Sequence, residues 1–329
     1  MLSRTADHLF WMARYIERAE NTARMLDVNL STSLLPQSAQ ASERGWRALL
    51  SISELTEEFD ERYPVVSPRD VIDFMVRDST NPSSIHTCLQ AARENARAVR
   101  GSLTTEVWET HNDTWLDLQR KLSDRTSERD PQSFFEWVKF RSHLSRGVTI
   151  GTMLKDEAFY FVRLGTFLER ADNTARLIDV KYHNLDDGLD GASAALRDET
   201  ESSVDHPLDF YHWAAVLRSV SAFETYRKVY RDVITPSRVA ELLILRGDMP
   251  RSLANCVNEV SLNLEMVRND QSSETERRAG LLRAELRYGR IQDILTLGLH
   301  LYLTEFLERI NDLGERISED FLVPLQAVN

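Results

Sequence analysis

The sequence has few of the residues that disulfide-linked or turn-rich folds need. Its 329 residues include 2 cysteines, 12 glycines and 9 prolines. Two cysteines cannot build a disulfide framework or a zinc ribbon. An all-β chain with many tight turns would need more glycine, so the composition favours helices. Basic residues are also outnumbered, with 40 against 52 acidic residues.

The charge balance and the short apolar runs argue against nucleic-acid and membrane partners. The sequence shows no clustered basic patch of the kind that nucleic acid or an anionic lipid surface attracts. The longest apolar run, 294–303, contains His300 and is too short to span a bilayer. Arg14 and Glu17 interrupt the apolar stretch near the N-terminus, which is unlike a signal peptide. We therefore expect a cytoplasmic protein that binds neither nucleic acid nor membrane.

An internal repeat is the most informative feature that is present. Residues 17–28 read ERAENTARMLDV and residues 169–180 read ERADNTARLIDV, with nine of twelve positions identical. Weaker matches follow both copies, and they include Pro82 with Pro250 and Cys88 with Cys256. No stretch alternates apolar and polar residues long enough for a strand. We therefore expect an all-α, antiparallel helical bundle built from two duplicated, pseudo-symmetric halves, over 1–125 and 134–318.

Local signals predict where several helices begin and where loops lie. Ser67 and Thr235 each precede a proline and can cap a helix, and Ser84 and Ser252 form a second pair of caps. Residues 123–133 are polar and predict a loop, and the pattern from about 281 to 317 predicts one long closing helix. Residues 184–207 carry seven acidic residues and one arginine, which predicts an acidic, mobile loop.

The repeated motif places charged residues on an apolar helix face. At about 100° per residue, Ile16 and the apolar residues around it define a core face that includes Glu20 and Asp27. Arg18 points the other way on this wheel. Burying unpaired ions costs several kcal/mol each, so these groups must be paired or must coordinate something. The candidate motif residues are Glu17, Arg18, Glu20, Asn21, Arg24 and Asp27 in the first copy, and Glu169, Arg170, Asp172, Asn173, Arg176 and Asp179 in the second.

Two interpretations of this charged face stay open. Glu20 and Arg24 are spaced for a local salt bridge, as are Arg24 and Asp27, so one interpretation is an ion-pair network that fixes helix register. Each copy nevertheless has three acids for one arginine. We therefore expect an excess of four negative charges, which would attract further arginines, a cation or a cationic part of a ligand, and the second interpretation is a binding or catalytic site.

A metal or cofactor site has little support in the sequence. Carboxylates on two helices resemble half of a di-iron bundle, but such bundles also supply Glu-x-x-His motifs, and none occurs here. The sequence contains no glycine-rich phosphate loop and no clustered Cys/His set. We expect no bound metal and no cofactor, with an all-oxygen magnesium or manganese site as the alternative. A weaker third echo of the motif occurs at Glu308 and Arg309, which is either a coincidental charged turn or a further copy.

The segments LSRTADHLFWMARYIERAENTARMLDV and NPSSIHTCLQAARENARAVRGSLTTEVWE resemble the bacterial alpha-E domain family. This is a predicted helical family named for a Glu-Arg motif, which maps onto Glu17-Arg18 and again onto Glu169-Arg170. The resemblance covers about residues 1–315. Genes of the family typically lie beside, or are fused to, a circularly permuted ATP-grasp protein and a transglutaminase-like protein. The resemblance therefore implies a role in an amide-ligating or peptide-modifying system.

Three functions are compatible with this resemblance. The first is an accessory or binding subunit that holds an ATP-grasp protein, and possibly a transglutaminase-like protein or a peptide-like substrate. The second is an enzyme in which Glu17 or Glu20 acts as general acid or base and Arg24 orients the substrate. The third is a purely structural helical scaffold.

Overall fold

The computed structural model describes residues 1–34, 38–186 and 207–322, and every regular element in these ranges is a helix. The all-α prediction is therefore confirmed. The first part of the chain forms α1 (Ser3–Ser33), α2 (Ala39–Ile52), α3 (Thr56–Asp60), α4 (Pro68–Val76), α5 (Ile85–Ala98), the short 3₁₀ helix η1 (Arg100–Ser102) and α6 (Thr105–Ser123). The next helices are α7 (Thr126–Arg129), α8 (Pro131–Thr152), α9 (Glu157–Asp186), α10 (Pro207–Ser219), α11 (Phe223–Tyr230) and α12 (Pro236–Ile244). The last are α13 (Leu253–Val267), α14 (Ser273–Tyr288), α15 (Ile291–Leu297) and α16 (Leu299–Phe321).

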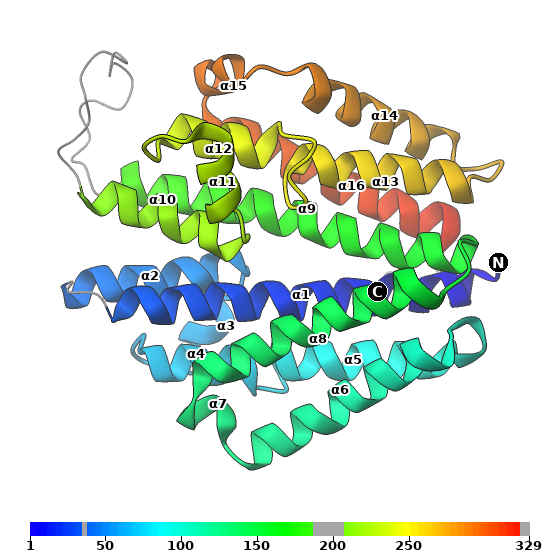
Figure 1. The fold of residues 1–329 in the computed structure, drawn as a ribbon, viewed down its shortest axis with the longest axis horizontal. Coiled ribbons are helices and arrows are strands. Elements are labelled where there is room, and N and C mark those ends of the chain that lie inside the picture. Colours follow the sequence, from blue (N-terminus) through cyan, green and yellow to red (C-terminus); the bar gives the residue numbers. More distant parts are fainter. Residues whose placement is uncertain (35–37, 187–206, 323–329) are drawn as a thin grey trace.

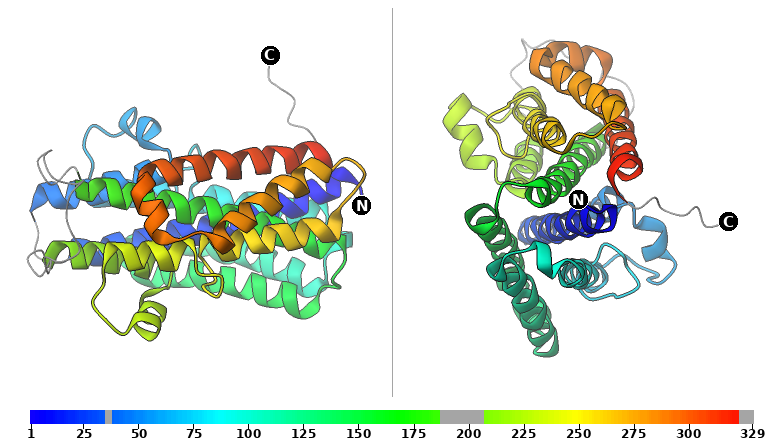
Figure 2. Two further views of the ribbon diagram at one scale, coloured as in Figure 1. Left: turned by 90° about the horizontal axis from the view of Figure 1, so that it is seen from above. Right: turned by 90° about the vertical axis from the view of Figure 1, so that its right-hand side faces the viewer.

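Two long helices, α1 and α9, lie side by side at the centre of the molecule (Figures 1 and 2). They run in the same direction, because the N-terminal amine of Met1 pairs with Glu157 and, further along both helices, Glu17 pairs with Arg170. The backbone of Gly165 closely approaches that of Phe10, between these two contacts. The antiparallel arrangement that we expected therefore does not describe the central pair.

The neighbours of the central pair run antiparallel to it. Helix α5 lies against α1, and α8 crosses α1 so that Lys139 bonds to Asp27 near one end and Arg146 to Glu17 further along. On the other side, α13 and α16 lie against α9 (Figure 2). The stacking of these helices buries α1 and α9 on more than one side, which explains why polar groups of the repeated motif are buried in both.

Three of the four predicted helix caps form, and all three are serines. The hydroxyl of Ser67 accepts a hydrogen bond from the backbone N–H of Asp70 at 3.1 Å. Ser84 and Ser252 cap α5 and α13 in the same way, with N–H to O distances of 3.1 and 3.0 Å. Thr235 also precedes its helix, but its side chain makes no capping bond. The spacing of apolar residues and these caps together place the starts of the helices around the central pair.

The prediction of one long closing helix over 281–317 is wrong. Three helices occupy this region, because α14 ends before Gly289 and α15 ends at Leu297, just before Gly298, whose φ of +104° is unfavourable for residues with a side chain. The polar segment 123–133 likewise contains the short helix α7. The predicted acidic loop over 184–207 lies almost wholly outside the described residues, since α9 reaches Asp186 and α10 begins at Pro207.

None of the described helices is long and apolar enough to cross a membrane. Their apolar residues instead form one core cluster, which includes the fully buried Trp46 and Trp213. The division of the chain into two halves, over 1–125 and 134–318, stays a prediction.

Candidate functional site

The two Glu-Arg motifs bind each other across the contact between α1 and α9. The Nε and Nη2 atoms of Arg170 donate to the two carboxylate oxygens of Glu17 at 2.9 and 2.8 Å. In the opposite direction, Nε and Nη2 of Arg18 donate to the two oxygens of Glu169 at 2.6 and 3.1 Å. Each pair is bidentate, the geometry that gives an arginine–carboxylate contact its strength and its directionality. The glutamate of each motif is therefore held by the arginine of the other.

These ion pairs lie inside the protein. Glu17 is 1% exposed and Glu169 is 5% exposed. Burial alone would raise the pKa of Glu17, but the guanidinium groups of Arg170 and Arg251 lower it to about 2. Burial would likewise raise the pKa of Glu169, and Arg18 and Arg14 lower it to about 2. Both carboxylates are therefore ionised over the whole physiological pH range.

Further arginines converge on Glu17 and on the fully buried Glu20. Arg251, just before α13, donates to Glu17 at 2.8 Å, to Glu20 at 2.5 Å and to the Asn21 side-chain oxygen at 2.9 Å. Arg146 on α8 donates to both carboxylates, at 3.1 and 2.5 Å. We call this cluster the Glu20 network. Its charged members are Glu17, Glu20, Arg24, Arg146, Arg170 and Arg251.

Local contacts complete the surroundings of Glu20. Arg24, one turn further along α1, donates to Glu20 at 2.8 Å, which confirms the predicted i,i+4 pair. The hydroxyl of Ser142 on α8 donates to Glu20 at 2.6 Å. Burial would raise the pKa of Glu20, but Arg251, Arg146 and Arg24 hold it well below its usual range. Glu20 is therefore an ionised carboxylate whose oxygens are already occupied by donors.

A second cluster surrounds Glu169 and contains the rest of the second motif copy. Arg14 joins Arg18 on Glu169 at 2.7 Å. One turn away, Arg176 donates to Asp172 at 2.9 and 3.1 Å and also pairs with Glu54. We call this cluster the Glu169 network. Its charged members are Glu169, Asp172, Glu54, Arg14, Arg18 and Arg176.

The remaining predicted residues lie outside both networks. Asp27 pairs with Lys139 of α8 at 2.9 Å, and Asp179 lies 2.6 Å from the His300 ring. Asn173 is partly buried, whereas Asn21 belongs to the Glu20 network. The third echo is not part of either network, because Glu308 is exposed and Arg309 pairs with Glu285 on α14.

The expected excess of negative charge is wrong for the Glu20 network. Four guanidinium groups surround two carboxylates there, and no third carboxylate in the described ranges pairs with any of the four. Arg14, Arg146 and Arg251 were not predicted as members of the site, because each comes from outside the two twelve-residue copies. One signal in the sequence did point to Arg251. The weaker part of the repeat aligns it with Ser83, so the two copies differ in charge at this position. Arg18 was also misplaced, because α1 is buried on two sides and its second face meets α9.

The structure offers little for nucleophilic or metal chemistry at the motif. Among the residues that the structure describes, no group of three His, Cys, Asp or Glu side chains could hold a metal ion. Cys88 and Cys256 are buried, and burial raises the pKa of both thiols to about 12. Thiolates do not form at that pKa near neutral pH, so neither cysteine is an activated nucleophile.

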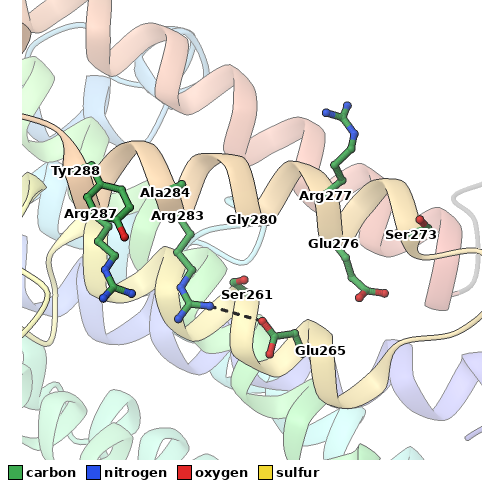
Figure 3. A pocket seen from close by; sticks show the side chains of 10 residues that line it. All are labelled: Ser261, Glu265, Ser273, Glu276, Arg277, Gly280, Arg283, Ala284, Arg287 and Tyr288. Carbon is green, nitrogen blue, oxygen red and sulfur yellow. Dashed lines mark ion pairs between the residues drawn. The ribbon is translucent and has the colours of Figure 1, made fainter.

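A cavity of about 500 Å³ lies elsewhere, between α13 and α14 (Figure 3). Three arginines and two glutamates line it, and Arg283 pairs with Glu265 across it at 3.6 Å. Tyr288 stands at one end of the cavity (Figure 3). It contains no residue of either motif copy, so the candidate site remains the pair of networks between α1, α8, α9 and the start of α13.

The chain is similar to two uncharacterized mycobacterial proteins, one from Mycobacterium bovis and one from Mycobacterium tuberculosis. Each is 24% identical over 340 residues, which covers 94% of this chain but only 35% of the relative. The chain therefore spans about a third of the length of the curated relatives it matches. No solved structure matches it.

A family model supplies the stronger assignment. It describes a predicted alpha-helical domain with a conserved ER motif, and it matches residues 1–322. The helical fold and the two Glu-Arg dipeptides that bind each other agree with this description. The chain belongs to the Alpha-E family.

Proposed function

We propose that this chain is a cytoplasmic accessory or binding subunit of an amide-ligating or peptide-modifying system. Its partners in this proposal are an ATP-grasp protein, which performs the ligation, and a transglutaminase-like protein. Two features support the proposal. The family resemblance implies these partners, and the mycobacterial relatives continue well beyond the region that this chain covers, so a domain of this kind occurs together with further polypeptide.

The low pKa values and the occupied carboxylate oxygens of the motif glutamates support a binding rather than a catalytic role. A general acid or base needs a pKa near the working pH and a free path to the substrate. The arginines around Glu17 and Glu169 lower both pKa values to about 2, and the carboxylate oxygens are occupied by guanidinium groups. Glu20 is fully buried and has the same character. These three carboxylates suit the anchoring of helices better than proton transfer.

The proposal includes the two-half architecture that the repeat predicts. In it, the reciprocal Glu17–Arg170 and Arg18–Glu169 pairs fix the register of the two central helices. The surface around them then presents a fixed arrangement of groups to the partner or to the peptide-like substrate.

The test is reconstitution. The chain is purified alone, and also with an ATP-grasp protein and a transglutaminase-like protein encoded in the same genome. ATP-dependent amide formation is then followed for each combination. We expect no turnover by the chain alone and turnover by the ATP-grasp protein that depends on the chain. Turnover by the chain alone that is lost in Glu17→Gln would contradict the proposal and favour the enzyme.

A purely structural scaffold is the second candidate, and the reciprocal ion pairs favour it. The two candidates differ in what the motif variants do. Glu17→Gln/Glu169→Gln is compared with the wild type by thermal melting and by capture of the ATP-grasp protein. Lost capture with an unchanged melt would make the motif a functional surface. A melting temperature lowered by several degrees with capture retained would leave the motif a structural network.

A further inference from the structure

The two networks occupy corresponding places in the sequence repeat but differ in charge. The Glu169 network consists of two adjacent groups: Glu169 faces Arg14 and Arg18, and Asp172 and Glu54 face Arg176, so its charges balance over the network as a whole. In the Glu20 network two carboxylates face four guanidinium groups, which leaves two positive charges without a counter-ion among the described residues. Both networks hold a motif Glu-Arg pair, but one buried carboxylate with two arginines suffices in the Glu169 network, whereas four arginines converge on Glu17 and Glu20.

The surplus charge is costly where it lies. Arg24 and Arg251 are 7% and 6% exposed and share the carboxylate of Glu20, so that single negative charge does not fully compensate the desolvation of both guanidinium groups. Arg146 is more accessible, and its side chain is 25% exposed. The network therefore has a buried interior and one side that reaches solvent along α8.

The histidine on that open side, His143, cannot accept hydrogen bonds from both of the arginines beside it. The ring of His143 lies between Arg24 and Arg146, with a guanidinium Nη2 atom 3.2 Å from each ring nitrogen. Burial lowers the pKa of His143, and Arg146, Arg24 and Arg251 lower it further against the opposite effect of Glu20, so the ring is neutral at pH 7. A neutral imidazole has one acceptor nitrogen and one N–H. One arginine N–H therefore faces an N–H, whichever tautomer forms.

A second donor in the same network also lacks an acceptor. The Asn21 side chain is 3% exposed, and its oxygen accepts from Arg251. Its Nδ2 group is buried without a hydrogen-bond partner in the described part of the molecule. The Glu20 network thus has more donors than acceptors, as well as more positive than negative charges. An oxyanion would supply both the missing acceptors and the missing negative charge.

We propose that the Glu20 network binds an oxyanion, the carboxylate or phosphoryl group of a ligand, which takes the place of the His143 ring between Arg24 and Arg146. The His143 side chain is 54% exposed, so it can turn toward solvent when the anion enters. Planar carboxylates and phosphates both match the donor arrangement of guanidinium groups. This inference deepens the proposed function, on which its biological meaning rests, because a carboxylate is a substrate of an ATP-grasp ligation and an acyl phosphate is its intermediate.

Binding to the purified chain is measured by isothermal titration calorimetry with two probes, inorganic phosphate and N-acetylglycine, at constant ionic strength. N-acetylglycine amide is the neutral control. We expect saturable binding of at least one anion and none of the amide, and the tighter probe identifies phosphoryl or carboxylate as the preferred source. Absence of saturable binding by both anions would overturn the proposal.

Variants test the position of the site. Arg24→Gln and Arg146→Gln should each weaken binding by about tenfold or more, because each removes a charge-assisted hydrogen bond. Arg176→Gln is the matched control, since Arg176 corresponds to Arg24 in the repeat but belongs to the balanced network. It should bind the anion as the wild type does. Equal affinity in Arg24→Gln, Arg146→Gln and wild type would place the anion elsewhere.

A variant with its own carboxylate keeps the proposal testable if an arginine variant fails to fold. His143→Glu places an acceptor for both arginines on α8, so we expect a higher melting temperature and no remaining binding of added anion. A lowered melting temperature with anion binding intact would contradict the proposal.

The anion-binding experiment does not require the partner proteins. If no anion binds but the reconstituted ligation still depends on the chain, only the oxyanion site is refuted. If the anion binds but the ligation does not depend on the chain, only the accessory role is refuted.

Discussion

At the scale of single residues, the Glu-Arg dipeptide does not act as one unit. Neighbouring residues of a helix point about 100° apart, so Glu17 and Arg18 reach different partners. Glu17 turns to Arg170 and Arg251, whereas Arg18 turns to Glu169. Since α1 and α9 run in the same direction, each dipeptide meets the other at the same level. The pairing across helices is what gives the sequence pattern its physical meaning.

A double-mutant cycle measures this pairing. Glu17→Gln and Arg170→Met remove the two partners of one buried ion pair, so we expect a coupling free energy of about 1–3 kcal/mol in urea unfolding. Glu17→Gln and Arg18→Met are the control cycle, because these neighbours in the chain make no ion pair with each other. The control coupling should stay below about 0.5 kcal/mol. A larger coupling within the dipeptide than across the helices would refute the reciprocal arrangement.

The depressed pKa of Glu169 predicts how stability depends on pH. Its carboxyl titrates near pH 2 in the folded protein, against an ordinary value of 4.5, so the folded state favours the ionised form. The resulting stabilisation, about 3 kcal/mol, is present above pH 4.5 and is lost as the pH falls toward 2. Unfolding free energies measured across that range should therefore fall less steeply in Glu169→Gln than in the wild type.

The control for this prediction is Glu54→Gln. Glu54 also pairs with an arginine, Arg176, but its side chain is 70% exposed. Exposed ion pairs contribute about 0–1 kcal/mol, so this variant should keep the wild-type pH dependence. If the unfolding free energy fell equally steeply with pH in Glu169→Gln and in the wild type, the buried pair would add no stability of its own.

The sequence was informative at this scale where interactions are local. The spacing of Glu20 and Arg24 predicted their pair, and the apolar wheel predicted that Glu20 is buried. The sign of the net charge around Glu20 could not be predicted, because Arg146 and Arg251 lie far away in the chain and are brought in by the packing of α8 and α13. Only tertiary structure decides which distant side chains balance a buried charge.

At the scale of secondary structure, the close approach of α1 and α9 depends on Gly165. A Cβ atom at this position would lie 2.2 Å from the backbone oxygen of Phe10 and 3.3 Å from the Ala13 side chain. A backbone atom of a packed helix cannot turn aside as a long side chain can. The two central helices can therefore adopt their present distance only with glycine at position 165.

Gly165→Ala should destabilise the protein for this reason. Alanine gains up to about 1 kcal/mol of helix propensity, but the clash forces the helices apart and costs about 1–3 kcal/mol or more. We expect a net loss of stability in thermal and urea unfolding. Gly147→Ala on α8 is the control, because a Cβ atom added there would meet no atom within 4 Å apart from its chain neighbours and the backbone of its own helix, so only the propensity gain applies. A stabilised Gly165→Ala would show that α1 and α9 are not in close contact.

Helix starts were predicted better than helix ends and directions. Ser67, Ser84 and Ser252 cap their helices because capping depends on residues within one turn. The break at Gly298 was missed, since a single glycine within an apolar pattern does not distinguish a helix interior from a turn. The parallel direction of α1 and α9 depends on how the intervening helices connect them, and local sequence patterns do not predict this.

At the scale of the whole molecule, both networks join segments that lie far apart in the chain. Every arginine that pairs with Glu17, namely Arg146, Arg170 and Arg251, lies after residue 125. Both arginines that pair with Glu169 lie on α1. Each half of the repeat therefore depends on the other for the counter-ions of its buried carboxylate, so the halves resemble one folding unit more than two domains.

This dependence predicts a single cooperative unfolding transition. A separate fragment of residues 1–125 would leave Glu17 without any of its guanidinium partners, and a fragment of residues 134–318 would do the same to Glu169. An unpaired buried charge costs several kcal/mol, a large share of the 5–15 kcal/mol or so that stabilises a typical domain. Calorimetry of the full chain should show one transition, and each fragment alone should show no cooperative melt by circular dichroism. Mixing the fragments should restore helical signal, because each supplies the other's counter-ions. Two separate transitions in the full chain, or a fragment that melts cooperatively on its own, would instead establish the halves as independent domains.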